Sequence, residues 1–160
     1  MHIAEVVTIA KSLPLLRLNT YKSLILSYSA DYRRIFRKKN LKAFRANGKI
    51  GDFSQLHFSA GKRQQAYNLQ GRMDDQGMVT LDWENDEEAY NFEAADRLNV
   101  IVLPSNRSFS PKLLEGLEVL RAAEKATFPL ERGKGMKIHL YCFFESPDGK
   151  RFSNSQYIKL

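Results

Sequence analysis

A tight turn between two alternating segments is the feature that most constrains what this chain can fold into. From Val79 to Glu84 apolar and polar residues alternate, which predicts a strand with one buried face and one solvated face. The preceding segment 64–73 also has strand character. Between the two, Asp74-Asp75-Gln76-Gly77 has the Asp start and the Gly end of a tight turn. The sequence therefore predicts an antiparallel hairpin here.

Other segments also have the composition of strands. The segment 99–103 (NVIVL) is compact and β-branched, and 53–59 is a further predicted strand. Segments 136–145 and 151–158 flank the turn sequence Ser-Pro-Asp-Gly at 146–149, which predicts a second hairpin at the C-terminus.

Helical patterns lie on both sides of the strand-rich region. Ser110 is a suitable N-cap, Pro111 suits the first helical position, and leucines follow at helical spacing, which predicts a helix over 110–127. Apolar residues at helical period predict a short helix over 2–13. A longer helix from about residue 20 is favoured over a short strand at 22–28.

These elements predict the α+β fold class. We expect a single domain over 1–160, with an antiparallel sheet of about five or six strands covered by the N-terminal helices and the helix at about 110–127. A chain of 160 residues with 43% apolar and 27% charged residues is typical of one globular domain, and no repeat or linker divides it.

The expected location is cytoplasmic, without a membrane partner. No run approaches the roughly 20 apolar residues of a membrane span. The apolar N-terminus carries Glu5 and Lys11 and lacks a basic start, so we interpret it as core and not as a signal peptide. The single cysteine, Cys142, excludes an intrachain disulfide and fits a reducing compartment.

The charge of the chain is concentrated in one segment. Residues 31–49 hold eight Arg or Lys and one acid, which gives +7, and the net charge of the whole chain is also +7. Ser29 as N-cap and Asn47-Gly48 as C-terminal stop predict a basic helix, with a bend or break near Asn40 because Leu41 falls on the basic face. The predicted nucleic-acid-binding residues are Arg33, Arg34, Arg37, Lys38, Lys42 and Arg45.

Two sites for chemistry have weaker support. His139 and Cys142 are close in sequence, but residues three apart on a strand point to opposite faces and cannot share a metal. Cys142 alternates with apolar residues, which predicts a buried, inert thiol. We therefore predict no metal site, no cofactor and no catalytic residue from these patterns.

A run of acidic residues is the third candidate site for chemistry. Residues 74–96 hold nine Asp or Glu and no Lys or Arg, and Asp82 and Glu84 share one strand face that could hold a divalent cation. The ordinary interpretation is a solvated acidic surface. Another is that these acids neutralise the basic segment within the fold.

The sequence favours a small non-enzymatic nucleic-acid-binding protein that contacts phosphates through the basic segment. The alternative is an accessory or inhibitor protein that binds another protein through a dipolar surface. A metal-dependent hydrolase that uses Asp82 and Glu84 is the least favoured hypothesis.

Overall fold

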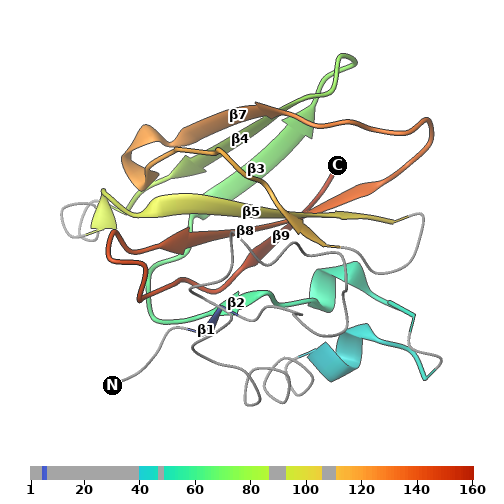
Figure 1. The fold of residues 1–160 in the computed structure, drawn as a ribbon, viewed down its shortest axis with the longest axis horizontal. Helices are drawn as coiled ribbons and strands as arrows, with labels where there is room; N and C mark the ends of the chain where they lie inside the picture. The colour runs from blue at the N-terminus through green and yellow to red at the C-terminus, as the bar shows by residue number, and fades with distance from the viewer. Residues whose placement is uncertain (1–4, 7–39, 47–48, 87–92, 106–110) are drawn as a thin grey trace.

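Two antiparallel sheets lie face to face, with a layer of short turns beneath them (Figure 1). The computed structural model describes residues 5–6, 40–46, 49–86, 93–105 and 111–160.

The upper sheet in Figure 1 has three strands in the order β3-β4-β7. Its strands are β3 (Tyr67–Met73), β4 (Met78–Glu84) and β7 (Lys125–Pro129). The short 3-10 helix η3 (Arg121–Ala123) leads into β7.

The second sheet has four strands in the order β6-β5-β8-β9. They are β5 (Arg97–Pro104), β6 (Lys112–Leu113), β8 (Ile138–Glu145) and β9 (Gln156–Lys159). Strands β5 and β8 pair along their whole length, from Arg97 opposite Glu145 to Pro104 opposite Ile138.

The third layer lies below the four-stranded sheet in Figure 1. It contains the two-stranded pair of β1 (Glu5–Val6) and β2 (Ser59–Ala60) and the 3-10 helices η1 (Leu41–Ala43) and η2 (Phe53–Gln55).

Three layers produce two apolar cores, one on each face of the four-stranded sheet. The first core lies between the two sheets, and its buried members include Val79, Leu81, Trp83, Leu98, Val100, Phe128, Leu140, Cys142 and Phe144. The second core lies on the opposite face, and it contains Ala43, Leu56, Phe58, Ile101, Leu103, Tyr141, Phe143 and Phe152. Alternate residues of β5 and β8 therefore enter different cores, as the pleat of a strand requires.

The predicted hairpin at 64–84 is confirmed. Strands β3 and β4 pair across the turn, Gly77 has φ of 85°, and the Asp74 carboxylate accepts hydrogen bonds from the backbone N–H groups of Gln76 and Met78. The strand at 99–103 and the C-terminal hairpin are also confirmed, because β5 spans the first and β8 pairs with β9 in the second. Cys142 is buried as predicted, although it lies between two sheets and not beneath a helix.

The predicted α+β fold class is wrong. The structure is mostly β, and the helices that are described over their whole length are 3-10 helices of three residues, so within the described residues no long helix covers a sheet. A sheet of five or six strands is replaced by two sheets of three and four strands.

The predicted helix over 110–127 is an extended segment instead. Lys112 and Leu113 pair with β5, Leu114 donates its N–H to the carbonyl of Val100, and Leu98 donates to the carbonyl of Val119. The segment therefore supplies the hydrogen-bond partners that the edge of β5 would otherwise lack. Gly116, at φ of 76°, has a left-handed conformation that interrupts a right-handed helix.

Three other predicted elements differ from the structure. Glu5 and Val6 form strand β1, so a helix over the whole of 2–13 is wrong, and 53–59 begins with the 3-10 helix η2 and not with a strand. The predicted long helix lies outside the described residues up to 39. No helix of the described residues is long and apolar enough to cross a membrane.

We predict that the hairpin turn is intolerant of a side chain at Gly77. A Cβ at this residue would lie 2.7 Å from the carbonyl oxygen of Leu130, in addition to the cost of a positive φ. Gly77→Ala should therefore lower the free energy of unfolding by roughly 2–4 kcal/mol in urea titrations. Gly116→Ala is the matched control, because Gly116 has a positive φ with no atom within 4 Å of the added Cβ. Equal losses in the two variants would contradict the predicted close contact.

Candidate nucleic-acid interface

Two of the six predicted nucleic-acid-binding residues lie within the described part of the chain. Lys42 and Arg45 are both exposed. The other four, Arg33, Arg34, Arg37 and Lys38, lie outside the described residues. The interface that the structure brings together is therefore the end of the basic segment, from Leu41 to Ile50.

This end of the segment is irregular and not an α-helix, which corrects the predicted basic helix over its last residues. The 3-10 helix η1 begins at Leu41, directly after Asn40, where a break was predicted. Phe44 then pairs with Ile50 in an antiparallel bridge, and the N–H of Arg45 donates to the carbonyl of Lys49 at 2.7 Å. The chain thus reverses direction and places Arg45 and Lys49 opposite each other.

Two buried contacts hold the turn in place. The side chain of Asn40, which is fully buried, accepts a hydrogen bond from the backbone N–H of His57 at 2.6 Å and donates to its carbonyl at 3.0 Å. Ala43 is also fully buried and belongs to the second core. Asn40 and Ala43 thus hold the turn against the fold, whereas Leu41, Lys42 and Arg45 face solvent.

The layer that carries these cations is attached to the sheet by aromatic side chains. Phe53 of η2 stacks on His139 of β8 with ring centroids 3.8 Å apart and planes 5° from parallel. The hydroxyl of Tyr141 donates to the carbonyl of Phe53 at 2.7 Å. On the sheet itself, Nδ1 of His139 lies 2.7 Å from the hydroxyl of Tyr157.

The pKa of His139 reflects the positive charges at this end of the sheet. Burial is the main cause that lowers the pKa of His139 to about 4, and the positive charges of Lys159 and Lys137 contribute to this shift. Lys159 of β9 and Lys137, which directly precedes β8, thus lie near the attachment point of η2.

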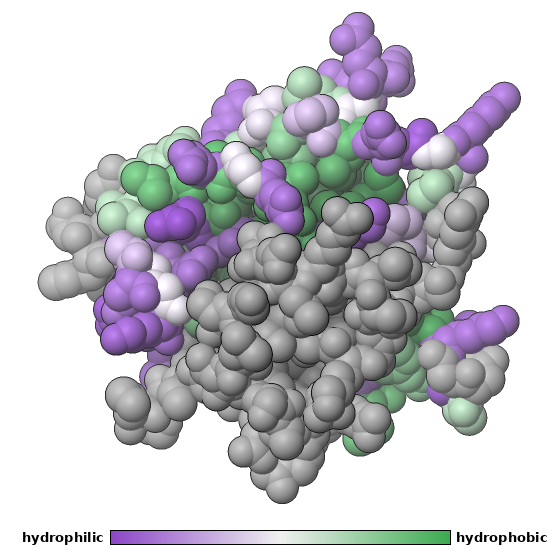
Figure 2. Space-filling model, viewed as in Figure 1, coloured by the Kyte–Doolittle hydropathy of each residue, from purple (hydrophilic) through white to green (hydrophobic). Residues whose placement is uncertain are grey.

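Figure 2 shows hydrophilic side chains at the lower right, where Figure 1 places the 44–50 segment.

The described acids of 74–86 and 93–96 form no ion pair with Lys42 or Arg45. Asp82 pairs with Arg72 on the exposed face of the upper sheet. Asp96 pairs with Arg63 at 2.5 Å and with Arg121 at 3.4 Å. Lys42 and Arg45 form no ion pair with any described residue.

The acidic segment is also not simply a solvated surface, which corrects the ordinary interpretation of its sequence. Asp96 is 0% exposed and Arg121 is 2% exposed, and the guanidinium of Arg121 lies 3.8 Å from the ring centre of Phe144. Glu93 lies 3.5 Å from Arg63 and 3.6 Å from Arg121. Burial raises the pKa of Asp96 and lowers that of Arg121, and the ion pair between them opposes both shifts.

The residues that the sequence suggested as candidates for catalysis or metal binding have structural roles in the fold. Burial raises the pKa of Cys142 to about 12, so the thiol is protonated and enclosed. His139 faces the second core while Cys142 faces the first, as predicted. Of the proposed cation pair, Asp82 binds Arg72 and Glu84 accepts a hydrogen bond from Asn68 at 2.9 Å. The described residues contain no group of three His, Cys, Asp or Glu that could hold a metal ion.

Sequence reasoning missed the buried ion network of Arg63, Glu93, Asp96 and Arg121. Arg63 and Arg121 are separated from Asp96 by 33 and 25 residues, so no local spacing links them. Asp96 was counted with the surface acids. Arg121 falls within the predicted helix over 110–127, and no role was predicted for it.

Comparison with known proteins gave no match, since no family model, no curated protein and no solved structure is significantly similar to this chain. The described residues define a mostly β protein with two packed sheets of three and four strands.

We predict that Asp96 is essential for stability. Asp96→Asn would leave the guanidinium groups of Arg63 and Arg121 without their shared buried anion, so the free energy of unfolding should fall by roughly 3–5 kcal/mol. Asp82→Asn is the matched control, because the Asp82–Arg72 pair is largely exposed and should contribute no more than about 1 kcal/mol. A loss at Asp96 as small as that at Asp82 would refute this role.

We also predict a pH dependence that originates at His139. Its pKa is about 4 in the folded protein and 6.5 in the unfolded chain, so the unfolded state binds more protons between these values. Stability should therefore fall as the pH drops from 6.5 towards 4, by up to roughly 3 kcal/mol in total from this group. Urea titrations of His139→Phe should show a smaller loss over this range than the wild type.

Substitution of the exposed His57 by Gln is the control for this measurement. An unchanged pH profile in His139→Phe would exclude His139 as the origin.

Proposed function

We propose that this protein is a small non-enzymatic nucleic-acid-binding protein that contacts phosphates through its basic segment. The residues proposed to do so within the described part of the chain are Lys42 and Arg45. The remaining four, Arg33, Arg34, Arg37 and Lys38, are proposed from the sequence.

One observation carries this proposal. The ion pairs between described residues join Arg63 and Arg121 with Glu93 and Asp96, and Arg72 with Asp82, while Lys42 and Arg45 are exposed and pair with no described acid. A cation that is neutralised inside its own fold is not available to a polyanion, whereas an exposed one can exchange its counterions for phosphates.

Three of the groups that could perform catalysis are enclosed in the fold, which supports binding over chemistry. The thiol of Cys142 and the imidazole of His139 are 1% and 4% exposed, respectively, so neither is accessible to a substrate in the folded state. Asp96 is enclosed with its arginines. The exposed charges of the basic segment are in contrast accessible to a partner.

The local backbone supports contact with phosphates and not with base edges. Residues 41–46 and 49–50 form a 3-10 helix and two antiparallel arms that pair with each other, and neither is a regular helix that could lie in a major groove. Phosphate contacts fix the position of a protein on nucleic acid but carry no direct sequence information. We therefore expect weak sequence preference.

The proposed binding should depend steeply on salt. With roughly four to six phosphate contacts, the logarithm of the affinity for duplex DNA should fall with the logarithm of salt concentration at a slope of about −4 to −5. Lys42→Gln with Arg45→Gln should flatten this slope by roughly two units and weaken binding about tenfold or more at about 50 mM salt. Fluorescence anisotropy with a labelled duplex measures both quantities.

The control is Lys150→Gln with Arg151→Gln, which removes the same charge at the turn that follows β8. Equal effects of the two double variants would show that net charge alone drives binding. Failure of the wild type to bind any nucleic acid at about 50 mM salt would overturn the proposal and would favour a protein partner.

A further inference from the structure

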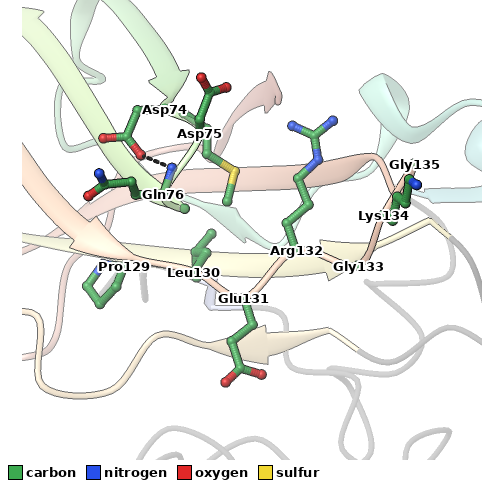
Figure 3. Close-up of a pocket in the computed structure, with 12 residues that line it drawn as sticks. Asp74, Asp75, Gln76, Pro129, Leu130, Glu131, Arg132, Gly133, Lys134 and Gly135 are labelled. Atoms are coloured by element: carbon green, nitrogen blue, oxygen red, sulfur yellow. Dashed lines mark hydrogen bonds between the residues drawn. The ribbon is translucent and has the colours of Figure 1, made fainter.

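A groove lies between the turn of the β3–β4 hairpin and the segment 129–135 that connects β7 to β8. Its volume is about 790 Å³, and Figure 3 shows the side chains that line it. One wall is the turn Asp74–Gly77, and the other contains Glu131, Arg132 and Lys134. None of the described residues of the basic segment lines this groove, so it is a second candidate site.

Backbone contacts fix both walls of the groove. The N–H of Leu130 donates to the carbonyl of Gly77 at 2.8 Å, which joins the connecting segment to the turn. The N–H of Met136 donates to the carbonyl of Gly133 at 3.0 Å. Nε of Arg132 donates to the carbonyl of Met136 at 2.9 Å, so the guanidinium is held in one orientation.

Not all of the charged residues that line the groove direct their charge into it. Asp74 is occupied by the backbone N–H groups of its own turn, and Glu131 points away from the turn in Figure 3. Arg132 extends between Asp75 and Lys134, and the structure gives its two terminal nitrogens no partner among the described residues. The groove is thus left with two cations and one carboxylate.

We propose that this groove binds a phosphodiester group of the same nucleic acid, an inference that rests on the proposed function. An arginine fixed at Nε presents its terminal nitrogens to one phosphate as a planar fork, and a nearby lysine adds a second charge. The connecting segment and the 44–50 reversal share the right-hand end of the molecule in Figure 1. Lys137 and Lys159 lie close enough to His139 at that end to lower its pKa.

Asp75 adds a restriction on the ligand. A carboxylate that faces two cations across a groove repels a densely charged anion, but it accepts a hydrogen bond from a hydroxyl beside a single phosphate. The 2′-hydroxyl of RNA is such a donor, and it is the group by which proteins distinguish RNA from DNA. The groove therefore favours a ribose phosphodiester.

The test compares Arg132→Gln with Lys134→Gln, as a double variant, with the wild type. Anisotropy with labelled oligouridylate should show an affinity loss of roughly tenfold or more at about 50 mM salt, and a flatter salt slope by between one and two units. The control double variant Lys150→Gln with Arg151→Gln should retain most of the affinity. Wild-type affinity should be higher for oligouridylate than for oligodeoxyuridylate, and Asp75→Ala should remove this difference.

Two outcomes overturn the groove while the proposed function stands. One is wild-type binding that Arg132→Gln with Lys134→Gln leaves unchanged, and the other is an equal loss in the control. If the wild type binds no nucleic acid, the proposed function fails. The groove is then decided by NMR titration with dimethyl phosphate, a phosphodiester with a single charge, in which saturable shifts of the Gly133 and Gly135 amides support a phosphodiester site and constant shifts refute it.

Discussion

The fold depends on burial of strand β8 on both faces. Residues 138–144 are all buried, with alternate side chains in the core between the two sheets and in the core beneath the four-stranded sheet. Burial of a large apolar side chain contributes about 2 kcal/mol, so the five largest apolar side chains of β8 contribute on the order of 10 kcal/mol, which is comparable with the whole stability of a typical domain. Both outer layers are required to cover this strand. The layer that carries the described cations of the basic segment is therefore part of the fold and not an appendage.

The charges of the protein serve two different purposes. Arg63, Asp96 and Arg121 are withdrawn from water and connect residues 63–65 with strands that are distant in sequence, because Arg121 also donates to the backbone carbonyl of Gln64. Such a network must be complete, since one missing partner leaves an uncompensated buried charge. Lys42 and Arg45 are instead exposed to water, on a turn whose buried contacts are made by Asn40 and Ala43. The protein thus separates the cations that maintain its fold from those that are available to a partner.

A sequence prediction was correct where the structure depends on interactions between residues that are close in the sequence. The hairpin at 64–84 depends on a turn of four residues and on alternation with period two, and both are local, so the prediction was correct. The burial of Cys142 could be predicted for the same reason. The helix over 110–127 had equally good local signals in Pro111 and its leucines, but the unpaired edge of β5 determined the conformation instead. For the candidate interface, the sequence identified Lys42 and Arg45 as basic residues, but it did not predict the reversal that presents Arg45, nor the groove at Arg132.

The sequence by itself determined where the chain turns and which strands have an apolar face, because turn chemistry and the pleat act between residues that are neighbours in the chain. It also determined that the excess positive charge belongs to residues 31–49. Only the tertiary structure decided that Leu113 and Leu114 extend along a sheet edge, that Asp96 is buried between two arginines, and that β8 is covered on both faces. The physical reason is that backbone hydrogen bonds at a sheet edge and the desolvation of charges depend on partners that the folded chain brings together from distant positions.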